Sequence, residues 1–140
     1  MSLGEWEVKP AWGRTRCTHD SPLYSRHELE VEAGGTCSVH YHRHRGNRFF
    51  VVSGSIAVVE YFAWEAERTI LTAGNTLDVP ALVVHQFQVI QSGACVEEYW
   101  PDRGPVRNDD IVRLCEGRRW KVEELADAPA ELLMRAVALL

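Results

Sequence analysis

Three histidines alternate along one short stretch of the chain, at His40, His42 and His44, shortly after a pair of glycines. In a β-strand, side chains two residues apart point to the same face, so the His40 and His42 positions lie about 7 Å apart on one side of the backbone. Two imidazoles in this arrangement can bind one divalent ion, with metal–nitrogen bonds of about 2.1 Å. The pair therefore predicts a metal site if a third ligand reaches the same ion.

His85 is the expected third ligand. It opens an apolar stretch soon after Pro80, and a barrel of strands can bring that stretch across from His40. The alternative interpretation is three unrelated buried histidines, each held by its own hydrogen bonds. We expect a divalent metal, either zinc, iron, manganese or nickel, on His40, His42 and His85.

The region that must position these histidines has the pattern of an all-β domain. Between residues 24 and 100, short β-branched and aromatic stretches alternate with turn residues every eight to twelve positions or so. The predicted strands cover residues 26–31, 36–41, 48–53, 55–61, 68–71, 76–79, 85–90 and 95–100. Nothing in this region has the period of a long amphipathic helix, so the pattern favours an antiparallel barrel or jelly roll over a βαβ fold.

We expect one domain in three parts. These are an N-terminal arm over residues 1–23, a barrel over 24–115 and a C-terminal segment over 116–140. After Pro129, leucines and alanines recur at helical spacing, which predicts a short helix there. Its apolar side would pack on the barrel or on a second subunit, with a membrane-surface helix as the alternative.

Composition narrows the class of partner. The chain has 140 residues and a formal net charge of −5, which disfavours broad electrostatic binding to nucleic acid or to anionic membranes. It has no stretch of roughly 20 apolar residues and no signal-peptide pattern, so we expect a cytoplasmic protein. The four cysteines form no C-x-x-C pair, and we expect reduced thiols. A small molecule is the expected partner.

Two spaced motifs resemble those of the cupin superfamily. The first runs from a glycine through an H-x-H pair to a second glycine, and is filled here by Gly34, His40, His42 and Gly54. The second is filled by Gly74, Pro80 and His85, with Leu82 in place of its second glycine. The resemblance implies a double-stranded β-helix barrel with metal ligands at His40, His42 and His85.

Asn47 stands where the cupin pattern has its glutamate ligand. Asparagine offers a neutral carbonyl oxygen, so the resemblance implies a fourth ligand at Asn47 that is weaker than a carboxylate. A centre of three neutral imidazoles also resembles the iron site of cupin thiol dioxygenases. The alternative is that loss of the acid leaves a site that no longer works with metal.

Within the cupins, the chain resembles the barrel domain of the bifunctional mannose-6-phosphate isomerase and GDP-mannose pyrophosphorylase family. The segments that carry this likeness are Pro10-Ala11-Trp12-Gly13, His42-Arg43-His44-Arg45-Gly46-Asn47, Phe50-Val51-Val52-Ser53-Gly54 and Asn108-Asp109-Asp110-Ile111-Val112-Arg113. The likeness implies a metal-dependent sugar-phosphate isomerase or epimerase, with Arg113 binding the phosphate. The segment before Arg113 could instead be a strand or loop that closes the barrel edge.

Such a reaction needs a group that moves a proton. Glu98 is one candidate, if Val96 and Trp100 also face the lumen, and His44 is another, because it continues the row of His40 and His42. We therefore expect a small anionic ligand, such as a sugar phosphate, in a homodimeric cupin. Two other classes stay open: a three-histidine iron dioxygenase, and a non-catalytic sugar-binding or regulatory cupin.

Overall fold

The computed structural model describes residues 2–63 and 65–129, and the regular elements in these ranges are nine β-strands and one short 3₁₀ turn. The all-β prediction is therefore confirmed. The elements are β1 (Glu7–Lys9), β2 (Gly13–Ser21), β3 (Tyr24–Val31), β4 (Val39–Tyr41), β5 (Arg45–Phe62), β6 (Glu65–Thr72), β7 (Thr76–Val79), β8 (Val84–Pro101), β9 (Val112–Cys115) and the turn η1 (Val122–Glu124).

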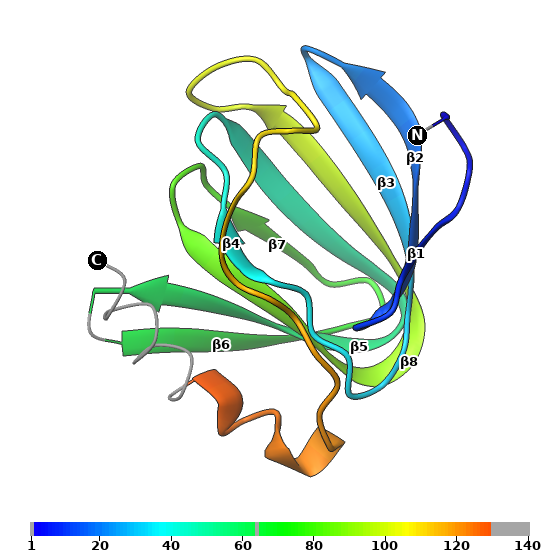
Figure 1. Cartoon of the computed structure of the whole chain (residues 1–140), viewed down its shortest axis with the longest axis vertical. Helices are drawn as coiled ribbons and strands as arrows, with labels where there is room; N and C mark the ends of the chain where they lie inside the picture. Colours follow the sequence, from blue (N-terminus) through cyan, green and yellow to red (C-terminus); the bar gives the residue numbers. More distant parts are fainter. Residues whose placement is uncertain (1, 64, 130–140) are drawn as a thin grey trace.

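Two long strands, β5 and β8, run through both walls of a barrel (Figure 1). The first half of β5 pairs with β7 and with the second half of β8, which pairs on its other side with β3. The second half of β5 pairs with β6 and with the first half of β8, which pairs with β4. We call the sheet β1-β2-β3-β8-β5-β7 the first sheet and the sheet β9-β4-β8-β5-β6 the second sheet.

The bends that let β5 and β8 change sheet lie at glycines. The sequence pattern predicts separate strands on either side of Gly54 and of Gly93, but each long strand continues through its glycine with a shift in register. Gly54 has a φ of +75°, which other residues rarely adopt. A Cβ at Gly93 would collide with the carbonyl oxygen of Ser53 on the paired strand. Four predicted strands are therefore two bent ones.

Apolar side chains form the core of the barrel. This core contains Trp12, Leu29, Val31, Cys37, Phe49, Val51, Ile56, Val58, Leu71, Val79, Phe87, Val89 and Cys95. The second sheet is also covered on its outer face, where Val39, Val59, Tyr61 and Ala128 form another cluster. Successive residues Val58 and Val59 thus lie in different clusters, which explains why this part of β5 is continuously apolar.

Both ends of the described chain contact the barrel. Residues 1–23, expected as an arm, include β1 and β2, and β2 pairs along its length with β3 as part of the first sheet. At the other end, Leu125 is fully buried and its carbonyl accepts a hydrogen bond of 2.9 Å from Nε2 of Gln88. The predicted helix after Pro129 lies outside the described residues.

Candidate metal centre

Three histidines converge inside the barrel from β4, from the residue that follows it and from β8. His40 and His85 are directly paired across the second sheet, and His42 follows two residues after His40. One ring nitrogen from each of the three lies within 4.8 Å of the other two. All three residues are buried, with ring centroids 4.5–5.3 Å apart. The structure therefore brings together the three predicted ligands.

Each imidazole is oriented by a backbone carbonyl. Nδ1 of His40 lies 2.8 Å from the Ser38 oxygen, Nδ1 of His42 lies 2.7 Å from the Asp110 oxygen, and Nδ1 of His85 lies 2.9 Å from the Val83 oxygen. A carbonyl can only accept, so each Nδ1 carries the proton and each Nε2 keeps its lone pair. This orientation is the usual one for metal-binding histidines.

The Nε2 nitrogens, which do not contact the orienting carbonyls, are suited to bind a divalent metal. Nε2 of His42 and Nε2 of His85 are buried and have no hydrogen-bond partner in the described part of the chain. Leaving a buried polar atom unsatisfied costs about 1–3 kcal/mol, a cost that a bound ion removes. Burial lowers the pKa of His42 to about 3 and that of His85 to about 4, so both rings are neutral, as ligands must be.

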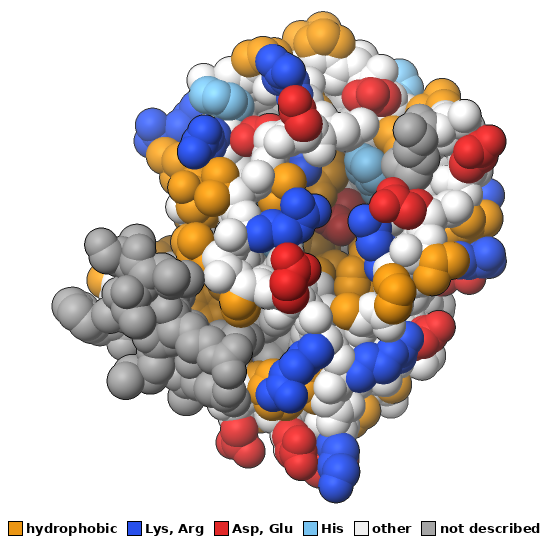
Figure 2. All heavy atoms as spheres, viewed as in Figure 1, with side chains coloured by type: hydrophobic (Ala, Val, Ile, Leu, Met, Phe, Trp, Pro, Cys, Tyr) orange, Lys and Arg blue, Asp and Glu red, His pale blue; other side chains and the backbone are white. Residues whose placement is uncertain are grey.

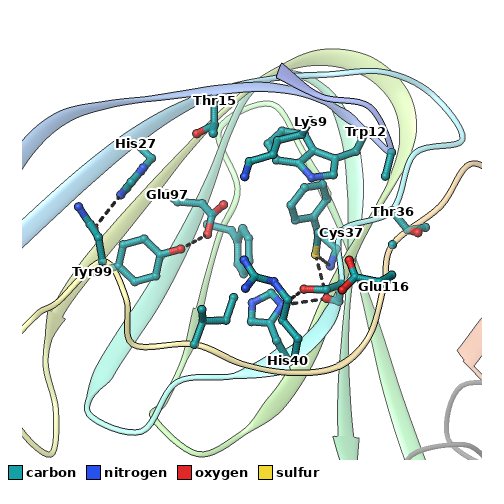
Figure 3. Close-up of a pocket in the computed structure, with 18 of the residues that line it drawn as sticks. Lys9, Trp12, Thr15, His27, Thr36, Cys37, His40, Glu97, Tyr99 and Glu116 are labelled. Atoms are coloured by element: carbon teal, nitrogen blue, oxygen red, sulfur yellow. Dashed lines mark hydrogen bonds between the residues drawn. The ribbon is translucent and has the colours of Figure 1, made fainter. Parts of the chain in front are cut away.

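A cavity of about 460 Å³ opens beside the three histidines and is lined by His40. Figure 2 shows the barrel hollowed on this face, with charged side chains around the opening. In Figure 3, Glu97 and Tyr99 point into the cavity from one wall and Trp12 lies across it. Other residues of its lining are Lys9, His27, Phe49, Phe87, Asn108, Arg113 and Glu116. The cavity has the size range of small-molecule sites.

Glu97, rather than the predicted Glu98, is the carboxylate of β8 that faces the lumen. Glu97 and Tyr99 line the cavity, so Glu98 between them lies on the opposite face of β8. There Glu98 accepts a hydrogen bond of 2.6 Å from the Tyr24 hydroxyl. Val96 and Trp100 lie on the same face of β8 as Glu98, so they do not face the lumen as the prediction required.

Asn47, the predicted fourth ligand, is fully buried in β5. Its Nδ2 donates a hydrogen bond of 2.9 Å to Oε2 of Glu97, and its Oδ1 has no partner in the described residues. Oδ1 is thus the only atom of this side chain that remains for a metal ion. Ligation by Asn47 stays a prediction.

His44 does not continue the row of His40 and His42, because the chain leaves β4 after Tyr41 and His44 is exposed. Arg45 instead enters the barrel, where it is buried with its guanidinium 3.8 Å from the centre of the Tyr99 ring. Its Nε lies 3.3 Å from Nδ1 of His42, but the shorter contact of that nitrogen is with the Asp110 carbonyl. Arg45 therefore puts a positive charge beside the histidines.

Arg113 lies in β9 directly opposite His40 and lines the cavity. It is exposed at the rim, and no carboxylate forms an ion pair with it in the part of the chain that the structure describes. The segment that carries it does close the barrel edge, since β9 pairs only with β4 among the described strands. A role of Arg113 in binding phosphate stays a prediction.

Asp110 positions a candidate ligand of the metal centre. The sequence patterns gave it no such role and noted it only as part of the segment from Asn108 to Arg113. Its carboxylate accepts hydrogen bonds of 2.8, 2.9 and 3.2 Å from the backbone nitrogens of Arg43, His44 and Arg45. Its carbonyl holds His42. One residue thus fixes both the loop after β4 and the ring of a candidate ligand.

Comparison with solved structures identifies the class of fold. KdgF from Halomonas sp. has a TM-score of 0.62 and 19% identity, and the match covers 75% of this chain and 91% of that one. An RmlC-like cupin from Shewanella frigidimarina gives 0.62 and 22%, covering 77% and 92%. Oxalate decarboxylase from Bacillus subtilis gives 0.66 and 14%, covering 79% and 30%. The prediction of a cupin barrel is confirmed.

Within the cupins, the chain matches the family described as mannose-6-phosphate isomerase C-terminal over residues 4–116, and it belongs to that family. Curated relatives include the mannose-1-phosphate guanylyltransferases of Klebsiella pneumoniae and Salmonella muenchen, 25% and 29% identical over 114 residues. The match covers 77% of this chain but only 22% of either relative.

No helix within residues 2–63 and 65–129 is long and apolar enough to cross a membrane. A cytoplasmic location remains an expectation from the sequence.

Proposed function

We propose that this cupin domain binds a divalent metal on His40, His42 and His85 and isomerises or epimerises a small anionic sugar derivative, such as a sugar phosphate. The observation that carries the proposal is the orientation of the three imidazoles. Each is fixed through Nδ1 by a backbone carbonyl, and together they lie beside a cavity lined by two carboxylates and two arginines.

The cavity offers separate groups for the parts of such a substrate. A divalent ion on the histidines would polarise a substrate carbonyl. Arg45 and Arg113 line the same cavity as His40 and supply positive charge there, which favours an anionic group on the substrate. Family membership supports a sugar phosphate over other anions, because the matched family takes its description from mannose-6-phosphate isomerase.

The test is interconversion of mannose 6-phosphate and fructose 6-phosphate by protein loaded in turn with zinc, iron, manganese and nickel. We expect turnover with at least one metal, and loss of turnover after chelation or in His42→Ala. Binding of mannose 6-phosphate that survives chelation, without turnover by any metal form, would instead identify a non-catalytic sugar-binding cupin.

One observation favours a second function, a three-histidine iron dioxygenase. The cluster of candidate ligands in the described residues contains no carboxylate, since Glu97 is not part of it and Asn47 occupies the position of the usual acid. Oxygen uptake by the Fe(II)-loaded protein with thiol or diketone substrates would support this alternative. Turnover of sugar phosphate in the absence of oxygen would exclude it as the main activity.

A further inference from the structure

A row of titratable side chains crosses the lumen face of the first sheet. The strand register places His27 of β3 directly opposite Glu97 of β8, and both side chains line the cavity. Directly opposed residues have their Cα atoms about 4.5–5.5 Å apart and share a face of the sheet. An imidazole and a carboxylate are thus neighbours on one wall, separate from the three candidate metal ligands.

The Glu97 carboxylate is held in one orientation. Its Oε2 accepts hydrogen bonds from the Tyr99 hydroxyl at 2.7 Å and from Nδ2 of Asn47 at 2.9 Å. A carboxylate oxygen can only accept, so the Tyr99 hydroxyl is the donor in this hydrogen bond. Oε1 accepts no hydrogen bond from the described residues, and Figure 3 shows Glu97 directed into the cavity. One carboxylate oxygen is therefore available to a bound molecule.

Tyr99 connects this carboxylate to the candidate metal centre. Its ring packs edge-on against His42 with centroids 5.4 Å apart, while its hydroxyl binds Glu97. The distance from the histidines to Glu97 is thus spanned by a single tyrosine side chain. A sugar in this cavity can therefore have its carbonyl toward the histidines and a neighbouring carbon toward Glu97.

We propose that Glu97 is a catalytic residue that moves a proton between adjacent carbons of an α-hydroxy carbonyl sugar, with Tyr99 and Asn47 as positioning residues. The proposal deepens the isomerase function above and rests on it. It also explains why two neutral side chains converge on one oxygen of a lumen carboxylate and leave the other to the cavity.

The isomerisation step conserves protons and electrons. Oε1 of Glu97 takes the proton from C2, and the electrons of the C2–H bond form a C1=C2 double bond while the C1 carbonyl electrons move to O1. The O2 proton then passes to O1, and Glu97 returns its proton to C1 as the C2 carbonyl forms. His27 is the available carrier between the oxygens, because its imidazole lies opposite Glu97 on the same wall of the cavity. No oxidant or reductant is consumed.

The test is incorporation of solvent deuterium into mannose 6-phosphate or fructose 6-phosphate in D₂O, monitored by NMR. We expect exchange in the metal-loaded wild type and exchange slower by about 10²–10⁴-fold in Glu97→Gln, the range of general acid–base catalysis. Glu98→Gln is the matched control, since the neighbouring carboxylate lies on the other face of β8, and it should exchange within about twofold of wild type. Both variants should have the metal content of the wild type. Their affinity for mannose 6-phosphate, measured by calorimetry, should also equal that of the wild type.

The outcomes separate this proposal from the function on which it rests. Glu97→Gln that exchanges at the wild-type rate overturns the role of Glu97 and leaves the isomerase function standing, whereas a wild type without exchange or turnover overturns both. If Glu97→Gln does not fold, Tyr99→Phe replaces it. That variant should lower the exchange rate constant at saturating sugar phosphate without changing its affinity, and an unchanged rate would contradict the positioning role.

A separate variant tests whether His27 carries the proton between the two oxygens. Because carbon exchange needs only Glu97, His27→Gln should slow conversion of one sugar phosphate into the other more than it slows deuterium exchange. Equal conversion by this variant would remove His27 from the scheme.

Discussion

Leu82 holds a backbone conformation that the cupin pattern assigns to glycine. Its φ is +72°, its side chain is 46% exposed, and its backbone nitrogen donates a hydrogen bond of 2.7 Å to the His42 carbonyl. A left-handed conformation costs a non-glycine residue roughly 1–2 kcal/mol. The chain retains the hydrogen bond to the histidine segment in spite of this cost.

We predict that Leu82→Gly raises the free energy of unfolding by up to about 1 kcal/mol. Removal of the left-handed strain outweighs the greater flexibility of glycine in the unfolded chain, which offsets about 0.5–1 kcal/mol. Urea denaturation measures the change, and Leu82→Val, which keeps a side chain and adds β-branching, should lower stability. A loss of stability in Leu82→Gly would show that the side chain matters more than the strain.

Asn47 places a neutral side chain where the cupin pattern has a carboxylate. We predict that Asn47→Glu lowers stability in a chelator by about 1–3 kcal/mol, because two carboxylates would then face each other where Asn47 now donates to Glu97. With zinc present the added carboxylate should raise metal affinity. Isothermal titration of both proteins measures this, with Asn47→Gln as the neutral control. An unchanged affinity would place this side chain outside the coordination shell.

At the scale of elements, the loop between β4 and β5 depends on Asp110. Burial by itself raises the pKa of this carboxyl, but the backbone N–H donors of Arg43, His44 and Arg45 outweigh it and hold the pKa below its ordinary value. A depressed pKa means that the carboxylate contributes stability above the unfolded pKa of about 3.9. That contribution is lost as the pH falls through the lower folded pKa.

We predict that Asp110→Asn destabilises the protein by about 1–3 kcal/mol at pH 6, because the amide accepts fewer hydrogen bonds and carries no charge. The difference from wild type should shrink below about pH 4, where the wild-type carboxyl becomes protonated. Denaturation at a series of pH values measures it. Asp109→Asn is the control, since the Asp109 side chain forms an exposed ion pair with Arg107, and an equal loss in both variants would contradict the anchoring role.

Sequence patterns predicted the elements better where one face of a strand differs clearly from the other. His40 and His42 were placed on one face because strand alternation fixes the relation of neighbours. The alternation in β8 is ambiguous, since Cys95 and Tyr99 are apolar on one face and Val96 and Trp100 on the other. The face of Glu97 and Glu98 was therefore decided by pairing with β3 and β5, which local sequence does not contain.

The same limit applies to residues whose position depends on long-range contacts. His44 continues the histidine spacing, but three hydrogen bonds to Asp110 turn the chain away from the β4 direction and bring Arg45 into the barrel. The glycines at positions 54 and 93 have the same local signature whether they form turns or bends. Only the pairing of β5 with β8 makes them bends.

At the scale of the molecule, the candidate ligands come from separate parts of the barrel. His40 and His42 lie at β4, His85 lies in β8, and the carbonyl that orients His42 comes from the segment before β9. The unfolded chain holds no such arrangement, so a bound metal stabilises the folded state. The homodimer expected from the sequence stays a prediction for sedimentation analysis.

We therefore predict that zinc stabilises the protein by about 2.7 kcal/mol at a free concentration one hundred times its dissociation constant. Chelation should reverse the effect. Thermal unfolding with and without metal measures it, and His42→Ala, which lacks a ligand, should respond much less than wild type. If no divalent metal changes the unfolding transition of the wild type, metal binding at this site does not stabilise the fold.

The central claim is that His40, His42 and His85 hold a metal ion, and metal analysis of protein purified without added metal tests it most directly. The account predicts about one divalent ion per chain in wild type and in His44→Ala, whose imidazole is exposed outside the cluster, and far less in His42→Ala. A wild type that carries no more metal than His42→Ala would contradict it.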